Sequence, residues 1–200
     1  MEHELIQAVD GNRRPIGIFP RAEIHRQGFL HETFHCWLVR RGEVFVQIRS
    51  AGKKDFPGLL DVTAAGHLLA NEQPEDGIRE LHEELGLKVR PADLIPLGVI
   101  RDDIELPGFI DREWAHVFLL PVPERVRFIL QKEEVEAVER LTLDQFASLV
   151  GGSVVRLANG RSVSKTDVVP HSDHYLEQVI KGMRDRVVRE WTERSSQSES

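Results

Sequence analysis

The sequence has one cysteine, Cys36, among 200 residues. An intramolecular disulfide framework is therefore excluded, and a reducing compartment is expected. No apolar run approaches the roughly 20 residues that a membrane-spanning helix needs. The first residues also lack the charged and apolar regions of a secretory leader. These absences predict a cytoplasmic protein with no membrane partner.

Basic residues are outnumbered, since 26 Lys and Arg stand against 33 Asp and Glu, giving a formal net charge of −7. Broad nucleic-acid surfaces neutralise phosphates with Lys and Arg, so nucleic acid is not an expected partner. A small anionic ligand is still allowed, because a bound cation can reverse the local field. With 40% hydrophobic residues, the chain can form one ordinary domain with additions.

The chain shows no internal repeat. Turn residues and two-residue alternation predict hairpins from Leu5–Val9 with Ile16–Phe19, and from Thr33–Val39 with Glu43–Arg49. Further strands are expected at Leu59–Ala65, Ile95–Ile100, Trp114–Pro121 and Glu134–Leu141, and helices at Arg21–Gln27, Leu143–Val150 and Tyr175–Trp191. The fold class is therefore α/β (α+β), because strands and helices interleave without strict alternation.

The sequence predicts that the chain is organised in four segments. Residues 1–30 form an N-terminal hairpin and helix extension, and residues 31–150 form the main domain. Residues 151–193 form a loop, with a hairpin at Asn159-Gly160, and a helix packed on the same domain. Residues 194–200 are polar and rich in serine, which predicts a disordered tail.

The segment from Gly66 to Leu87 carries most of the chemical information. Pro74 suits a first helical turn, and Gly86 suits the residue after a helix end. At about 100° per residue, one side of this helix is apolar and carries Ile78, Leu81 and Leu85. The other side carries three carboxylates within roughly 100°, namely Glu80, Glu83 and Glu84.

An acidic helix face is often simply solvated, since like-charge neighbours cost only about 0.2–0.5 kcal/mol per pair. Magnesium, however, takes hard oxygen ligands and is often completed by substrate phosphates. Three carboxylates and a loop carbonyl, from Ala65 or Gly66, meet that requirement. Arg79 either braces a carboxylate or contacts a phosphate, and its position just before Glu80 favours the brace.

This segment resembles the Nudix box, G-x5-E-x7-R-E-U-x-E-E-x-G-U, in which U is a bulky aliphatic residue. Residues 79–87 match its second half at every specified position, and Gly66 and Glu72 match its first half. The departure is the spacing from Glu72 to Arg79, where six residues stand in place of seven. This deletion affects Glu72 and the loop geometry, whereas the helical glutamates keep their spacing.

The resemblance implies a Nudix-type α/β/α sandwich around a mixed β-sheet, with residues 31–150 as the Nudix domain and the N-terminal hairpin as an extension. It also implies hydrolysis of a small-molecule diphosphate substrate with Mg²⁺ or Mn²⁺. Glu80, Glu83, Glu84 and Gly66 would then hold the metal, and one helical glutamate could be the base. A further glutamate from outside the box is expected among Glu113, Glu133 and Glu134; Glu134 is kept in the candidate catalytic set with Arg79.

A second resemblance is to the isopentenyl-diphosphate isomerase branch of the same superfamily. It implies a metal cluster of histidines and acids, here His25, His31, His67, Asp111 and Glu113, suited to zinc or manganese. With nine histidines in the chain, their chance placement on loops is the favoured interpretation. Ala65 stands where the isomerases use a cysteine, and Cys36 is expected to be a buried thiol. Isomerase chemistry is therefore secondary.

Three functions follow from these patterns. The first is metal-dependent hydrolysis of a small organic diphosphate, either nucleotide-linked or isoprenoid-like, by an enzyme that could be a homodimer. The alternatives are an isomerase and a non-catalytic diphosphate sensor. Arg49, Lys53 and Lys54 could reach a phosphate, but a solvated turn is favoured for them. His171 and His174 are assigned no ligand role, because they flank a predicted helix cap at Ser172 or Asp173.

Overall fold

The computed structural model describes residues 4–107 and 109–197. Within these residues, nine strands form one mixed sheet and two short strands form a separate hairpin. The sheet contains β1 (Leu5–Val9), β2 (Pro15–Pro20), β3 (Leu30–Arg40), β4 (Glu43–Arg49), β5 (Leu60–Asp61), β6 (Ala64–His67), β7 (Ile95–Leu106), β8 (Phe109–Pro121) and β9 (Val135–Thr142). The helices are α1 (Arg21–Gln27), α2 (Arg79–Leu85), α3 (Leu143–Val150) and α4 (Asp173–Gln197), and the small hairpin is β10 (Val155–Arg156) with β11 (Ser162–Val163).

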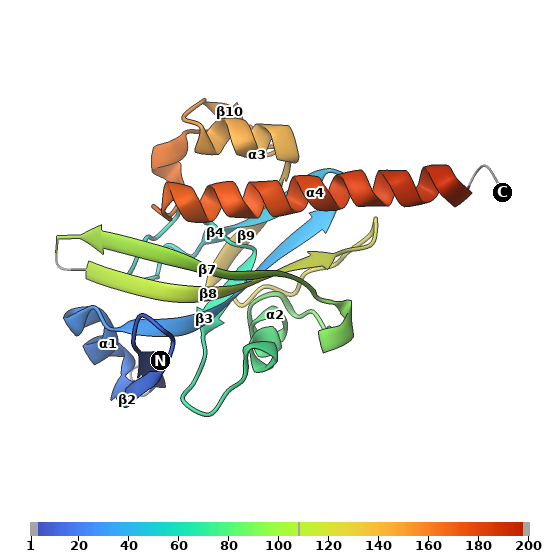
Figure 1. Ribbon diagram of the computed structural model, residues 1–200. Coiled ribbons are helices and arrows are strands. Elements are labelled where there is room, and N and C mark those ends of the chain that lie inside the picture. The colour runs from blue at the N-terminus through green and yellow to red at the C-terminus, as the bar shows by residue number, and fades with distance from the viewer. Residues whose placement is uncertain (1–3, 108, 198–200) are drawn as a thin grey trace.

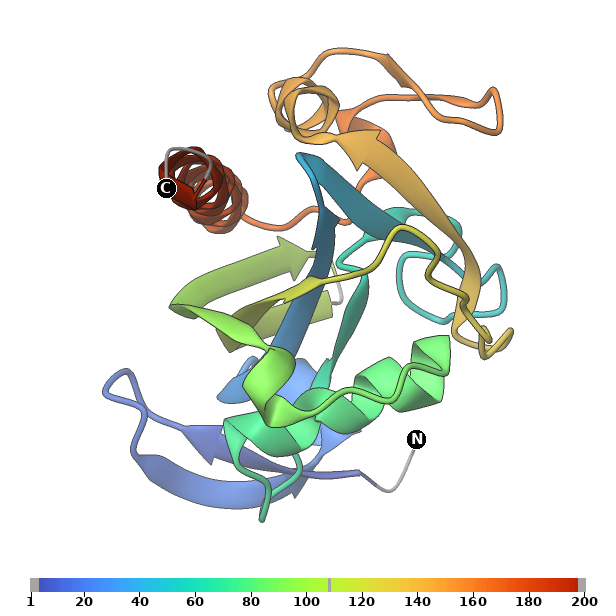
Figure 2. The same cartoon turned by 90° about the vertical axis from the view of Figure 1, so that its right-hand side faces the viewer.

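Strand β3 lies at the centre of the sheet. It pairs in parallel with β8 and antiparallel with β1, β4 and β6. Helices α3 and α4 lie on one face of the sheet, and α2 lies on the other (Figures 1 and 2). The predicted mixed sheet between helical layers is therefore confirmed.

Alternation along β3 divides the core into two layers. Phe34, Cys36 and Leu38 are buried on the face that packs against α2. Trp37 is buried on the opposite face with Phe146 of α3 and with α4. Cys36 is thus a buried free thiol, as the sequence predicts, and burial raises the pKa of its thiol far above the ordinary range.

The N-terminal extension belongs to the same sheet. Strands β1 and β2 form the predicted hairpin, and Ala8 of β1 pairs with His31 of β3. Helix α1 ends at Gly28, whose φ of 64° is left-handed; a Cβ there would collide with Ile110. This tight reversal allows α1 to place His25 beside the first residues of β3.

The sequence prediction is wrong for the single strand at Leu59–Ala65, which is divided into β5 and β6. At the break, the Thr63 hydroxyl donates to the carbonyl of Phe45 at 2.6 Å and accepts from the amide of Leu38 at 3.0 Å. A side chain therefore replaces the backbone ladder between β3 and β4.

Strands β7 and β8 are longer than predicted, because their polar ends pair with each other. The register opposes Asp103 to Arg112 and Ile104 to Asp111. This pairing brings acidic residues of both strands into the sheet. Their charged side chains carry no alternating apolar signal, so the sequence pattern stops at Ile100 and starts again only at Trp114.

Helix α4 begins at Asp173 and continues to Gln197. The predicted disordered tail is therefore wrong for residues 194–197, and residues 198–200 lie outside the described part of the chain. Extending an existing helix adds one hydrogen bond per residue without a new nucleation cost, so a polar sequence can remain helical. Among the described residues, no helix has the length and apolar character required to cross a membrane.

Candidate active site

A cavity of about 230 Å³ lies between α2, the start of β3 and the turn that joins β7 to β8. It brings together the acidic face of α2 and the predicted histidine cluster. All three helical glutamates line it, together with Gly66, His67 and Glu134. The candidate residues of the two family resemblances therefore lie around the same cavity.

Helix α2 directs its glutamates into this cavity because its other side is anchored in the core. Leu81 and Leu85 are fully buried, and Gly86 closes the helix with a left-handed φ of 69°. Glu84 is buried, and its Oε2 has no hydrogen-bond partner among the described atoms. A buried carboxylate oxygen without a donor is costly, so the site is suited to a cation.

Electrostatics at the helix support this interpretation. Burial raises the pKa of Glu84 well above its usual value, and the charge of Glu80 raises it further. Burial also raises the pKa of Glu80 to about 7, against the opposing charge of Arg79. A divalent cation between crowded carboxylates lowers the free-energy cost of ionising them.

Arg79 has the geometry of a brace. Its Nε lies 2.8 Å from Oε1 of Glu72, and its Nη2 donates to the carbonyl of His67 at 2.9 Å. The same guanidinium reaches Glu80 and Glu83. These contacts join the loop before the helix to the acidic face, which limits the freedom of each carboxylate.

The short spacing between Glu72 and Arg79 is accommodated by a 3₁₀-helix over Pro74–Ile78, which runs directly into α2. Glu72 accepts from the amide of Leu69 at 2.8 Å while it also pairs with Arg79. The deletion therefore leaves the contact between Glu72 and Arg79 intact.

Gly66 lies in β6, opposite Phe34 of β3. A Cβ at this position would collide with the carboxylate of Glu80. The absence of a side chain thus permits the acidic face of α2 to approach the backbone of β6. This close approach keeps the carbonyl of Gly66 among the candidate metal ligands.

A basic wall completes this half of the cavity. Lys53 pairs with Glu134, and Arg49 Nη1 donates to Oδ2 of Asp61 at 2.7 Å. The favoured prediction of a solvated turn is therefore wrong for Arg49 and Lys53, because both line the cavity. The partner of Lys53 directly precedes β9 and is 81 residues away, whereas the partner of Arg49 lies in β5, 12 residues away.

Of the three glutamates considered from outside the helix, Glu113 and Glu134 line the cavity, whereas Glu133 is exposed on the surface. Glu134 lies beside Lys53 and contributes to the field at Glu84. Glu113 instead belongs to the histidine side.

The histidine cluster is assembled by four separate elements. His25 comes from α1, His31 from β3, His67 from β6 and Asp111 from β8, and one ligand atom of each lies within 4.8 Å of all the others. The sequence favours chance placement of these histidines, and the fold brings four of the five candidate side chains together. The position of α1 and the pairing of β3 with β6 and β8 bring them together.

The ring nitrogens of the cluster are arranged for a cation. His25 Nε2 lies 3.1 Å from His67 Nε2 and 3.6 Å from Oδ1 of Asp111. His31 Nδ1 donates to the carbonyl of Phe29 at 3.1 Å, which leaves the lone pair of Nε2 directed at the cluster. That nitrogen and Oδ1 of Asp111 have no hydrogen-bond partner among the described atoms.

Neutral imidazoles are the form that binds metals. Burial lowers the pKa of His25 to about 4, and burial likewise lowers the pKa values of His31 and His67. Burial also raises the pKa of Asp111 well above its usual value, and the charge of Glu113 adds to this effect. The donor set of imidazoles and carboxylates suits zinc or manganese.

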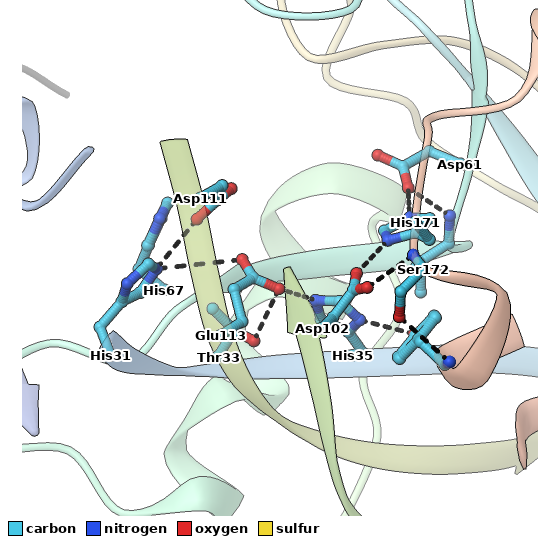
Figure 3. A network of polar contacts seen from close by, with 12 residues as sticks. His31, Thr33, His35, Asp61, His67, Asp102, Asp111, Glu113, His171 and Ser172 are labelled. Atoms are coloured by element: carbon cyan, nitrogen blue, oxygen red, sulfur yellow. Dashed lines mark hydrogen bonds and ion pairs between the residues drawn. The ribbon is translucent and has the colours of Figure 1, made fainter. Parts of the chain in front are cut away.

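Two groups in this region were missed by sequence reasoning. His35 Nε2 lies 3.2 Å from Oε2 of Glu113, and the other ring nitrogen of His35 contacts Tyr175 of α4. His171 lies between Asp102 and Asp61. Figure 3 shows these polar side chains extending from His31 and Asp111, past Glu113 and His35, to Asp102 and His171.

No local motif marks His35, Tyr175 or His171. His35 is two residues from Trp37 in an apolar strand, and His171 precedes a helix cap, where the amide of Tyr175 bonds Oγ of Ser172. The signal in the sequence that could have indicated His35 is its own polarity within an otherwise apolar strand.

The NUDIX domain model matches residues 29–156 of this chain. An uncharacterized Nudix hydrolase of Clostridium acetobutylicum is 33% identical over 204 residues, which cover 92% of this chain and 99% of the relative. An isopentenyl-diphosphate Delta-isomerase of Jannaschia is 31% identical over 146 residues, covering 72% of this chain and 81% of that protein.

Solved structures have the same fold. A crystal structure of a protein from Deinococcus radiodurans aligns with a TM-score of 0.60 at 22% identity. The alignment covers 75% of this chain and 91% of the Deinococcus chain. A MutT protein from Methanosarcina mazei aligns with a TM-score of 0.54 at 16% identity, covering 78% and 95%.

Proposed function

Because this chain belongs to the Nudix family and is a Nudix hydrolase, we propose that it hydrolyses a small organic diphosphate with the help of Mg²⁺ or Mn²⁺. Hydrolysis of a diphosphate-containing substrate follows from the family. The size of the substrate and the dependence on metal are the new parts of this proposal. The observation that carries them is a cavity of about 230 Å³ that contains the acidic face of α2 and an unpartnered oxygen of Glu84.

The acidic face has the donors that the metal needs. Glu80, Glu83 and Glu84 would hold it with the carbonyl of Gly66, and Arg79 would keep these carboxylates in place. Bound at this site, the cation would neutralise the diphosphate and make a water molecule more acidic. Glu134, which pairs with Lys53 and lines the same cavity, is our candidate for accepting the proton of the attacking water.

The cavity size supports a compact substrate. Sites for drug-sized ligands usually measure about 300–1,000 Å³, and this cavity is smaller. Its rim also carries Phe56 and Phe109, whose rings meet edge to face at 5.2 Å. Basic groups at Arg21, Arg49 and Lys53 line the same space, where they can attract the phosphates.

The histidine cluster supports a second metal site in the same cavity. His25, His31, His67 and Asp111 offer ligand atoms that lie close together, and Glu113 Oε1 lies 3.9 Å from His31 Nε2. Zinc or manganese is the expected occupant.

Isomerisation of isopentenyl diphosphate is the second candidate, favoured by this cluster and by the isomerase-named relatives. The reaction needs groups that add and remove protons at carbon. Ala65 cannot transfer a proton, and the buried Cys36 does not line the cavity. Incorporation of deuterium from solvent into isopentenyl diphosphate would favour isomerisation over hydrolysis.

The test is a phosphate-release screen of diphosphate compounds with Mg²⁺, Mn²⁺ or chelator. We expect metal-dependent turnover of short organic diphosphates, and a loss of at least about a hundredfold in Glu84→Gln, the scale of removing a charge-stabilising group. Glu75→Gln is the matched control, because Glu75 is exposed in the 3₁₀-helix before α2.

Two results would contradict the proposal. Normal turnover of Glu84→Gln would remove the role given to the helix. Tight diphosphate binding without turnover across the whole panel would instead favour the non-catalytic sensor.

A further inference from the structure

Tyr175 is the only tyrosine in the chain. It lies in the first turn of α4, beyond the residues 29–156 that match the family model. The side chain is fully buried. Its hydroxyl lies 2.6 Å from Nδ1 of His35 and 3.1 Å from Nε1 of Trp37. A residue outside the matched domain therefore contacts the strand that carries part of the cavity wall.

One set of hydrogen-bond directions gives every donor among these side chains an acceptor. The indole N–H of Trp37 can only donate, so the Tyr175 oxygen accepts from it. The Tyr175 hydroxyl keeps its own hydrogen, which points to His35 Nδ1. With Nδ1 assigned as the acceptor of this hydrogen, the ring proton of His35 is on Nε2.

The protonated nitrogen of His35 faces Glu113. His35 Nε2 lies 3.2 Å from Oε2 of Glu113, and the Thr33 hydroxyl donates to the same oxygen at 3.3 Å. Two donors therefore hold Oε2, which leaves Oε1 on the side of His31. Figure 3 shows Glu113 between His35 and the histidine cluster.

We propose that Tyr175 is a positioning residue, which fixes the Nε2–H tautomer of His35 and thereby orients Glu113 toward the histidine cluster. This inference rests on the second metal site of the proposed function. Partners behind a ligand typically change metal affinity by roughly 10- to 100-fold when they are removed. The C-terminal helix would then complete the site, in addition to covering the sheet.

The main alternative is that Tyr175 only packs α4 against the core. Tyr175→Phe separates the two explanations, because it removes the hydroxyl and keeps the ring. Val179→Ala is the matched control, since Val179 is a fully buried apolar residue one turn further along α4. This control loosens the packing of the helix and leaves the tyrosine hydroxyl in place.

The first measurement is the tautomer of His35 in the metal-free protein, read from ¹⁵N shifts of labelled histidine rings. We expect the Nε2–H form in the wild type and in Val179→Ala, and a mixture or the opposite tautomer in Tyr175→Phe. An unchanged tautomer in Tyr175→Phe would overturn the proposal, whether or not any metal binds.

The second measurement is Zn²⁺ affinity by calorimetry, with uptake at the cluster identified by its loss in His67→Ala. We expect Tyr175→Phe to weaken this uptake roughly 10- to 100-fold and Val179→Ala to leave it unchanged. Equal losses in both variants, or a tautomer change without weaker binding, would refute the link to Glu113. A wild-type cluster that takes up no Zn²⁺ would refute the second metal site and this link, while the tautomer result would still stand by itself.

A double-mutant cycle adds a rescue test. In His35→Gln, the amide nitrogen can donate to Glu113 without a tautomer to be fixed. Adding Tyr175→Phe to this variant should therefore cause little further loss of Zn²⁺ affinity. A full additional loss would show that Tyr175 acts by another route.

Discussion

Replacing His171 with glutamine should remove a pH-dependent part of the protein's stability. The ring of His171 donates from Nδ1 to Oδ2 of Asp102 at 2.6 Å and from Nε2 to Oδ1 of Asp61 at 2.9 Å. All three side chains are buried. Since both ring nitrogens donate, the histidine is a cation held between two carboxylates.

The magnitude follows from the pKa of this ring. Burial by itself lowers the pKa of His171, but the hydrogen bonds and charges of Asp102 and Asp61 outweigh burial and raise it to about 10. The ordinary value is 6.5. At about 1.4 kcal/mol per pKa unit, this shift corresponds to roughly 5 kcal/mol of unfolding free energy.

The sign is set by proton linkage. Between pH 6.5 and about 10 the folded protein keeps a proton that the unfolded chain releases, so stability falls as the pH rises, by up to about 1.4 kcal/mol per unit. Below pH 6.5 this contribution is fully present. The aspartates act in the opposite direction: the pKa values of Asp61 and Asp102 are lowered despite burial, so their contribution is lost as the pH falls through the acidic range.

The assay is urea unfolding followed by tryptophan fluorescence at intervals from pH 6 to pH 10. The advantage of the wild type over His171→Gln should be largest near pH 6 and should shrink toward pH 10. His174→Gln is the matched control, because His174 is exposed three residues away, and its curve should follow the wild type. A constant difference between wild type and His171→Gln at every pH would refute the charged state assigned to this ring.

Three further outcomes are expected from the site. Gly66→Ala should fold normally by circular dichroism, but its turnover should fall at least about tenfold, on the scale of a disturbed ligand environment. The reason is that the new Cβ would displace the carboxylate of Glu80. Full activity would contradict the close approach of Glu80 to β6. Arg79→Lys should lower turnover more than the exposed control Arg90→Lys, since only Arg79 contacts several site carboxylates; equal kinetics of the two variants would argue against a brace. Lys53→Met should raise KM for diphosphates with a smaller change in kcat, and an unchanged KM would exclude Lys53 from substrate attraction.

Local patterns were sufficient for the elements whose signal lies within one segment. The spacing of Ile78, Leu81 and Leu85 predicts which side of α2 is buried, because a helix with a fixed period can pack only its apolar side. That constraint also determines that the three glutamates share the other side. The turn residues around Asp10-Gly11-Asn12 likewise predict the first hairpin.

Tertiary structure decided everything that depends on which strands become neighbours. The parallel pairing of β3 with β8 opposes His31 to Glu113, and the antiparallel pairing of β7 with β8 opposes Asp102 to Glu113. Neither pairing has a signal within its own segment. The histidine cluster exists because α1 and the pairing of β3 with both β6 and β8 bring its members together.

The C-terminal segment illustrates the same division. The sequence indicates a helix near Tyr175 and a cap at Ser172, because capping depends on a few adjacent residues. It gives no reason for Tyr175 to meet His35 or for His171 to meet Asp61, partners that lie more than a hundred residues away. A polar side chain becomes a positioning group only when folding removes water and leaves one distant partner within hydrogen-bond distance.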